Sequence, residues 1–148
     1  MANMVAVIMG VLFILMGLAG FVSNNLLGAH LTLTHNLIHL VSGAVSLYIG
    51  LKGSPSAAKW FCITFGVVYL GLGVVGYWLG YERTESFLPD AAKDYGHNEN
   101  MFRIMPGRLE LGTMDHIIHV VIGAVYIIAG ALTRTRRSAT EFFEGNPE

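Results

Sequence analysis

The sequence predicts an all-α fold, a bundle of four transmembrane helices built from two parallel tandem helical hairpins. Three observations support this prediction. Hydrophobic residues make up 53% of the 148 residues and charged residues only 13%, whereas about 25% of a typical soluble domain is charged. Four apolar stretches are each close to the roughly 20 residues that a helix needs to cross a bilayer. The pattern of the first two stretches returns in the last two.

The four spans are predicted at residues 4–22, 34–51, 60–81 and 114–133, and their interiors contain no Lys, Arg, Asp or Glu. Helices are expected because a segment in lipid must satisfy its own backbone hydrogen bonds. The first stretch has no basic region before it and no clear cleavage site, so we expect a retained span. An outer loop at residues 82–113 and a cytoplasmic tail at residues 134–148 complete a single integral membrane domain, residues 1–148.

An internal repeat is clearest in the glycines and histidines. Matching residues in the first helix of each pair are 56 positions apart: Gly10 and Gly66, Gly17 and Gly73, Gly20 and Gly76. Matching residues in the second helix of each pair are 80 positions apart: His39 and His119, Gly43 and Gly123, Gly50 and Gly130. Because each copy has an even number of spans, the copies are parallel, and their pseudo-twofold axis is expected along the membrane normal.

Small residues are expected to hold the helices together, because lipid is as apolar as leucine and burial alone does not drive helix association. Gly76 and Gly80, for example, have the GxxxG spacing of close helix contacts. We therefore interpret the glycines as close-packing positions. Met9, Phe13 and Met16 of the first span are interpreted as packing or lipid-facing residues.

The basic residues of the short connections predict the orientation. Lys52 and Lys59 lie in the second connection, and three arginines follow the fourth span, so these segments and both termini are expected to be cytoplasmic. The first and third connections then lie outside. Residues 102–111 of the third connection mix apolar and basic side chains and are predicted to lie in the membrane interface. All six histidines fall on the outer side or in the outer half of the membrane.

The strongest candidate site is a group of histidines near the outer surface. His35 and His39 are four residues apart, as are Asp115 and His119, so each pair shares one helix face. Polar side chains inside a span are costly and usually have a role. One interpretation is purely structural: His39 and His119 form an interhelical polar cluster with each other, with Asp115, or with serines and backbone.

Ligand binding is the second interpretation of these histidines. His35, His39, Asp115 and His119, with His116 in reserve, could hold zinc, copper or iron. His39 and His119 could instead be axial ligands of a haem or of chlorophylls, and the glycine one turn after each histidine, Gly43 and Gly123, would then leave room for the macrocycle. Proton handling by an Asp–His pair is the third interpretation. If the cluster is structural, no cofactor is expected.

No catalytic machinery is evident in the sequence. It lacks HExxH, CxxC and the carboxylate-rich ExxH pattern of di-iron bundles, and the net charge of −1 argues against nucleic acid as a partner. We expect an accessory or binding subunit of a larger membrane assembly, surrounded by lipid and associated with other membrane proteins or with its own copies. The alternatives are a metal-, haem- or chlorophyll-binding protein and a component of proton-coupled transport.

The segments FILMGLAGF, NLIHLVSGAVSL and DHIIHVVIGAV together resemble a bacterial domain-of-unknown-function family of small four-span membrane proteins. Its members show a GFxxxGxxGF-like first helix and paired N-x-x-H-L-x-x-G and D-N-x-x-H-L-x-x-G helices. The positions that fit are Asn36, His39, Gly43, Asp115, His119 and Gly123. His116 stands where the family usually has asparagine, and His35 is not expected. The resemblance implies an integral protein of the bacterial cytoplasmic membrane, or an equivalent membrane, and supplies no activity.

Overall fold

The computed structural model describes residues 1–82 and 100–135, and this part of the chain is mostly helical. Its four helices are α1 (Ala2–Ala19), α2 (Leu33–Lys52), α3 (Pro55–Leu79) and α4 (Thr113–Leu132). They lie within five residues of the predicted spans at each end. The parts of the predicted outer loop and tail at residues 83–99 and 136–148, His97 among them, lie outside the described residues.

Three of the helices, α1, α3 and α4, are long and apolar enough to cross a membrane, which is what a membrane protein requires. The remaining helix, α2, carries several polar side chains, and these are buried inside the protein. They are His35, Asn36, His39 and Ser46. The lower hydropathy of α2 therefore reflects residues that face the other helices.

Short-range signals in the sequence explain where the helices begin. The Ser54 hydroxyl accepts a hydrogen bond from the Ala57 amide, and Pro55 follows at the first helical position, so α3 starts at a well-formed N-cap. The Thr32 hydroxyl accepts a hydrogen bond from the His35 amide in the same way at the start of α2.

The prediction of an all-α fold missed two small β-structures. Strands β1 (Asn25–Leu26) and β2 (Ala29–His30) form a hairpin, and β3 (Tyr81–Glu82), β4 (Asn100–Met105) and β5 (Leu109–Leu111) form an antiparallel sheet. Residues 102–111, which were expected to lie in the membrane interface, form most of the β4–β5 hairpin. Its turn contains Gly107 at φ 73°, and Arg103 pairs with Glu110 across it.

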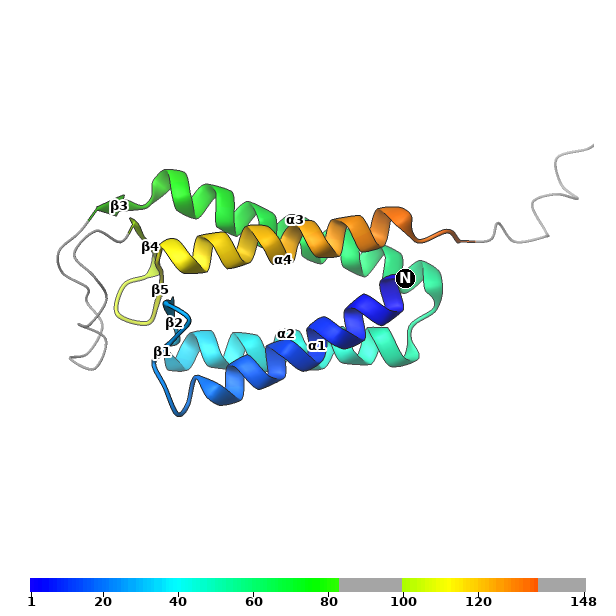
Figure 1. The fold of residues 1–148 in the computed structure, drawn as a ribbon, viewed down its shortest axis with the longest axis horizontal. Helices are drawn as coiled ribbons and strands as arrows, with labels where there is room; N and C mark the ends of the chain where they lie inside the picture. The colour runs from blue at the N-terminus through cyan, green and yellow to red at the C-terminus, as the bar shows by residue number, and fades with distance from the viewer. Residues whose placement is uncertain (83–99, 136–148) are drawn as a thin grey trace, which may run out of the picture.

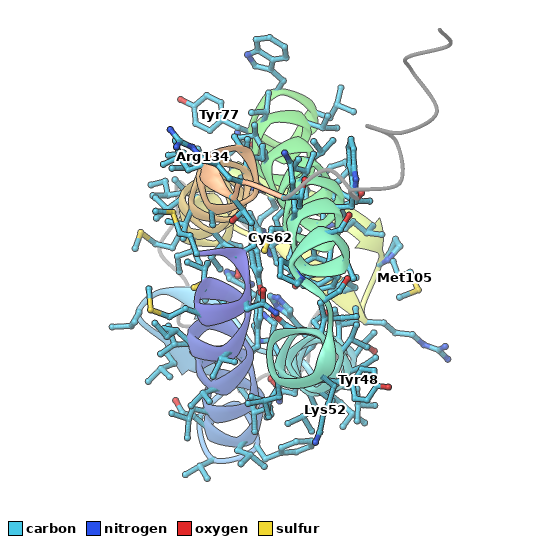
Figure 2. All side chains as sticks on the ribbon, turned by 90° about the vertical axis from the view of Figure 1, so that its right-hand side faces the viewer. Tyr48, Lys52, Cys62, Tyr77, Met105 and Arg134 are labelled. Atoms are coloured by element: carbon cyan, nitrogen blue, oxygen red, sulfur yellow. The ribbon has the colours of Figure 1, made fainter. Side chains whose placement is uncertain are left out.

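The strands gather at one end of the bundle, whereas the N-terminal end of α1, the α2–α3 turn and the C-terminal end of α4 lie at the other (Figure 1). We call the first of these ends the β end. Helix α1 packs along α2, and α3 packs along α4. Seen along the bundle, α1 and α2 occupy one half and α3 and α4 the other, with Cys62 between them (Figure 2).

Within each pair, the helix backbones meet at glycines. A Cβ atom on Gly10 of α1 would lie 3.0 Å from the carbonyl oxygen of Gly43 on α2. A Cβ atom on Gly66 of α3 would lie 2.8 Å from the carbonyl oxygen of Gly123 on α4. Any side chain at these positions would push the two helices apart, so glycine is what permits this close packing.

Between the two pairs, aromatic side chains fill the space. Phe13 of α1 lies 5.2 Å from Tyr69 and 6.5 Å from Tyr126, measured between ring centroids. The hydroxyl groups of Ser46 and Tyr126 form a hydrogen bond of 2.6 Å, and Ser46 donates to the Ala6 carbonyl at 2.8 Å. The two pairs therefore meet through side chains, aromatic rings together with small residues such as Ala58 and Cys62, unlike the glycine backbone contacts within each pair.

Candidate functional site

Three imidazole rings meet inside the bundle near the β end. His35 and His39 come from the first turns of α2, and His119 comes from the second turn of α4. The ring centroids of His35 and His39 are 4.3 Å apart, and those of His35 and His119 are 6.1 Å apart. Their exposed fractions are 3%, 6% and 5%. His39 and His119 were predicted to lie together, and in the structure the His35 ring lies beside both of them.

The hydrogen bonds of the three rings are incomplete. His35 Nδ1 lies 2.7 Å from the His30 carbonyl oxygen, and because a carbonyl only accepts, Nδ1 carries the proton and Nε2 is left as an acceptor. The Nδ1 atoms of His39 and His119 are buried without a hydrogen-bond partner among the described residues. Buried polar atoms are paired in most proteins, so these two atoms are exceptions to the usual pairing.

Asp115 has a capping role that was not predicted from the sequence. Its Oδ2 atom accepts hydrogen bonds from the Gly112 amide at 2.9 Å and from the His30 amide at 3.0 Å. The carboxylate therefore caps the start of α4 and ties it to the β1–β2 hairpin, since a helix N-terminus offers unpaired amides and favours negative charge. No hydrogen bond joins it to His119 within the described part of the chain.

A cavity of about 250 Å³ lies against the imidazoles, between α1 and α4. Its walls are apolar side chains of the two helices: Met9, Leu12, Phe13, Met16, Ile118 and Ile122. His35, His39, His119 and Asp115 also line it, as do Leu27 and Ala29 of the β1–β2 hairpin. Leu12 is 52% exposed, so the cavity borders the outer surface of the helices. The arrangement is an apolar recess with polar groups at its inner end.

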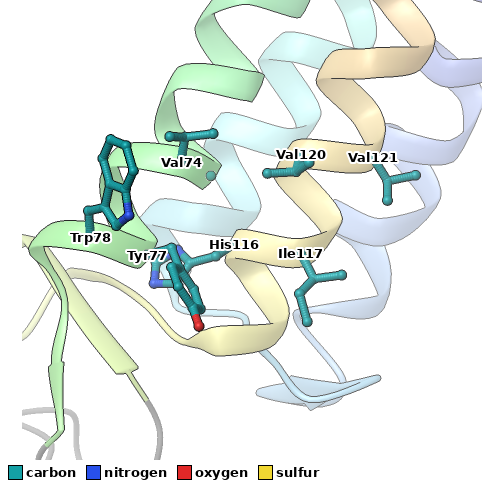
Figure 3. Close-up of a pocket in the computed structure, with 8 residues that line it drawn as sticks. Val74, Tyr77, Trp78, His116, Ile117, Val120 and Val121 are labelled. Atoms are coloured by element: carbon teal, nitrogen blue, oxygen red, sulfur yellow. The ribbon is translucent and has the colours of Figure 1, made fainter.

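His116 lies apart from the three imidazoles. Its ring packs against Gly76, and Nε2 donates to the Asn100 carbonyl oxygen at 3.0 Å. It borders a separate apolar groove of about 350 Å³ between α3 and α4, where Tyr77 and Trp78 also lie (Figure 3). Asn36 occupies the matching position in the first pair, where it packs against Gly20.

The structure does not bring the predicted metal ligands together as one group. His35, His39 and His119 are neighbours, Asp115 is engaged by two backbone amides, and His116 belongs to the groove between α3 and α4. Across residues 1–82 and 100–135, no three His, Cys, Asp or Glu side chains are arranged to hold a metal ion.

Gly43 and Gly123 do not border open space. A Cβ atom on Gly43 would lie 2.8 Å from the Gly10 carbonyl oxygen, and one on Gly123 would meet the Leu70 backbone nitrogen and the Gly66 carbonyl oxygen. The expected room for a macrocycle beside these glycines is occupied by the backbone of the partner helix.

Several residues of the site were not recognised in the sequence. Met9, Phe13 and Met16 were interpreted as packing or lipid-facing residues; Phe13 and Met9 do pack in the core, and all three also line the cavity. Their spacing of three and four residues places them on one face of α1, which was the available signal. His30 contributes only backbone atoms to His35 and Asp115, and side-chain patterns carry no information about such contacts.

Four helices, three of them long and apolar enough to cross a membrane, place the chain in the class of membrane-like helical proteins. The chain belongs to the family described as domain of unknown function DUF4383, whose model matches residues 3–98. The match spans α1 to α3 and ends before α4, so Asp115, His119 and Gly123 lie outside it. No curated protein and no solved structure matches the chain. The family description names no activity.

Proposed function

We propose that the chain is a four-span membrane protein made of two parallel hairpin repeats. Helix α2 supports this proposal because its polar residues face the other helices. The glycine contacts recur at the predicted registers: the Gly10–Gly43 contact has its counterpart in Gly66–Gly123, which are 56 and 80 positions further along the chain. Both termini are proposed to be cytoplasmic, and Lys52 and Lys59 lie at the bundle end opposite the strands.

We further propose that this protein binds a small lipid-soluble molecule in the cavity between α1 and α4. One observation carries the proposal: two imidazoles that are at least nine-tenths buried, His39 and His119, make no hydrogen bond with the described residues and line an apolar recess, together with His35 and Asp115 at its inner end. Ligand sites are typically apolar pockets with a few convergent polar groups. A bound molecule would form hydrogen bonds with the imidazole nitrogens that border the recess.

The other candidate functions have weaker support. Pockets for drug-sized ligands measure about 300–1,000 Å³, so a cavity of about 250 Å³ is small for a haem or a chlorophyll. Metal binding and proton-coupled transport would use the same three imidazoles, but neither accounts for the apolar walls. An accessory role in a larger membrane assembly is compatible with a ligand-binding site, and we propose it as the setting in which binding occurs.

Photolabelling tests this proposal. The probe is an alkylphenol with a diazirine in its chain, applied to the purified protein in lipid nanodiscs, and adducts are located by peptide mass spectrometry. We expect adducts on the segments that form the walls, residues 9–16 and 118–122. Uniform labelling of all exposed helix faces would contradict the proposal.

A pair of matched variants locates the site further. Leu12→Trp places a large side chain beside the cavity. Leu15→Trp places the same side chain on the same helix at a residue that is 57% exposed and does not line the cavity. Labelling of the cavity walls should fall in the first variant and persist in the second. An equal effect of both would show that the probe only partitions into the surrounding lipid.

A further inference from the structure

We propose that the cavity between α1 and α4 takes the head of a lipid-soluble quinol, a ring with hydroxyl groups and an apolar tail. This inference rests on the proposed function, because it names the ligand class of the same site. Its basis is the set of hydrogen-bond donors and acceptors that the protein presents around the cavity.

Two groups around the cavity are hydrogen-bond acceptors. With the Nδ1 proton of His35 donated to the His30 carbonyl, Nε2 of His35 has a lone pair and no partner among the described residues. Asp115 uses Oδ2 for both of its backbone amides, and its Oδ1 accepts no hydrogen bond from them. His35 and Asp115 both line the cavity, so a ligand that satisfies them must donate O–H or N–H groups.

The donors are His39 and His119. A neutral imidazole has one N–H and one lone pair. Their Nδ1 atoms are enclosed without partners, and an enclosed unpaired N–H is rarer in proteins than an enclosed unpaired acceptor. The proton is therefore assigned to Nε2, which makes no hydrogen bond with the described residues and is not among the enclosed unpaired atoms. Two N–H donors and two acceptors then surround one space, and a hydroxyl group, which both donates and accepts, matches this combination.

The size and surroundings of the cavity select a single ring with a tail. A cavity of about 150 Å³ is enough to hold benzene, so about 250 Å³ accommodates one substituted ring. Phe13, whose ring centroid is 5.6 Å from that of His39, gives the ring an aromatic neighbour. Exposed Leu12 and Leu27 at the rim give an apolar tail a surface continuous with lipid, and the thioethers of Met9 and Met16 adapt to irregular shapes.

Competition against the alkylphenol photolabel tests the ligand class under anaerobic conditions. The competitors share a ten-carbon tail: decyl-hydroquinone, decyl-benzoquinone and decylbenzene. The hydroquinone should compete at a concentration at least about tenfold lower than decylbenzene, a difference of about 1.4 kcal/mol. The benzoquinone should fall between them, because it accepts from His39 and His119 but donates nothing to His35. Equal competition by all three, or stronger competition by the benzoquinone than by the hydroquinone, would overturn the inference.

Two variants separate hydrogen bonding from folding. His119→Leu removes a donor and should bring the hydroquinone to within about twofold of decylbenzene, while the unliganded protein keeps its thermal stability because an unpaired buried polar group has been removed. His116→Asn is the control, because Asn36 already occupies the matching place in the first pair, and it should keep the full preference. Loss of the preference in both variants would contradict the assignment.

The outcomes also separate the two proposals. Labelling of the cavity walls without any preference for the hydroquinone refutes the quinol and leaves the binding function standing. No labelling of the walls by the alkylphenol refutes the binding function itself.

Discussion

The glycine contact between α3 and α4 provides the sharpest test of the packing. In Gly123→Ala, the new Cβ would lie 2.7 Å from the Gly66 carbonyl oxygen and would also meet the Leu70 backbone nitrogen. Both neighbours are backbone atoms of a helix and cannot rotate away. Gly71→Ala is the matched control, because a Cβ atom there would meet nothing within 4 Å.

The magnitude follows from these distances. An ordinary contact begins at 3.4 Å, so the two backbones must separate by at least about 0.7 Å, the difference between 3.4 and 2.7 Å, because the Leu70 backbone nitrogen lies closer still. A gap of that size loses a quarter to a half of the dispersion energy of each separated contact, and overpacking typically costs about 1–3 kcal/mol. Both variants gain the same helix propensity, about 1 kcal/mol. We therefore expect Gly123→Ala to be less stable than Gly71→Ala by about 1–3 kcal/mol.

Cys62 supplies the assay. It is the only cysteine of the chain and is fully buried, so its reaction with a fluorogenic maleimide during heating or denaturant titration reports unfolding in detergent micelles. Gly123→Ala should expose the thiol at a lower temperature than Gly71→Ala. Equal midpoints, or a higher midpoint for Gly123→Ala, would refute the argument that backbone contact at this glycine holds α3 to α4.

Three further predictions concern other contacts, each measured by unfolding with the same thiol assay. Ser46→Ala and Tyr126→Phe should each lower the free energy of unfolding by about 0.5–1.5 kcal/mol, because each removes the hydrogen bond between the two hydroxyl groups. The double variant should lose less than the sum of the two single losses. Full additivity would contradict the contact. Asp115→Ala should lower the free energy of unfolding by at least about 2 kcal/mol, because two backbone amides lose an ionic acceptor. Asp115→Asn should recover much of this stability. Equal losses in the two variants would argue against capping. Arg103→Met alone should destabilise the β4–β5 hairpin more than Arg103→Met combined with Glu110→Leu. The single change leaves the fully buried Glu110 without this cation, whereas the double change removes both charges. A larger loss in the double variant would refute the pairing.

The helices were predictable because apolar length is a strong local signal. The glycine positions were also predictable, since a 56- and 80-residue register in the sequence marks equivalent contacts in each helix pair. The β-structures were not predictable, because strands β1 and β2 have two residues each and show no period. The left-handed backbone of Leu27 in their turn, at φ 58°, is uncommon for a residue other than glycine.

The site was predicted in part. His39 and His119 are each the seventh residue of their helix, and both border the cavity together with His35, which lies one turn before His39. The cavity could not be predicted, since a repeat describes each helix pair and not the faces by which two pairs meet. The capping role of Asp115 depends on the His30 amide, and a backbone amide leaves no mark in a sequence.

The division of the recess between the two helix pairs has a consequence for biogenesis. Its walls come from α1 and α2 of the first pair and from Ile118, His119 and Ile122 of the second, so the recess has no complete wall until α4 has docked. A molecule captured there would act as a clasp between two separately made halves. Its uptake would then serve as a check that the halves have joined in the right register.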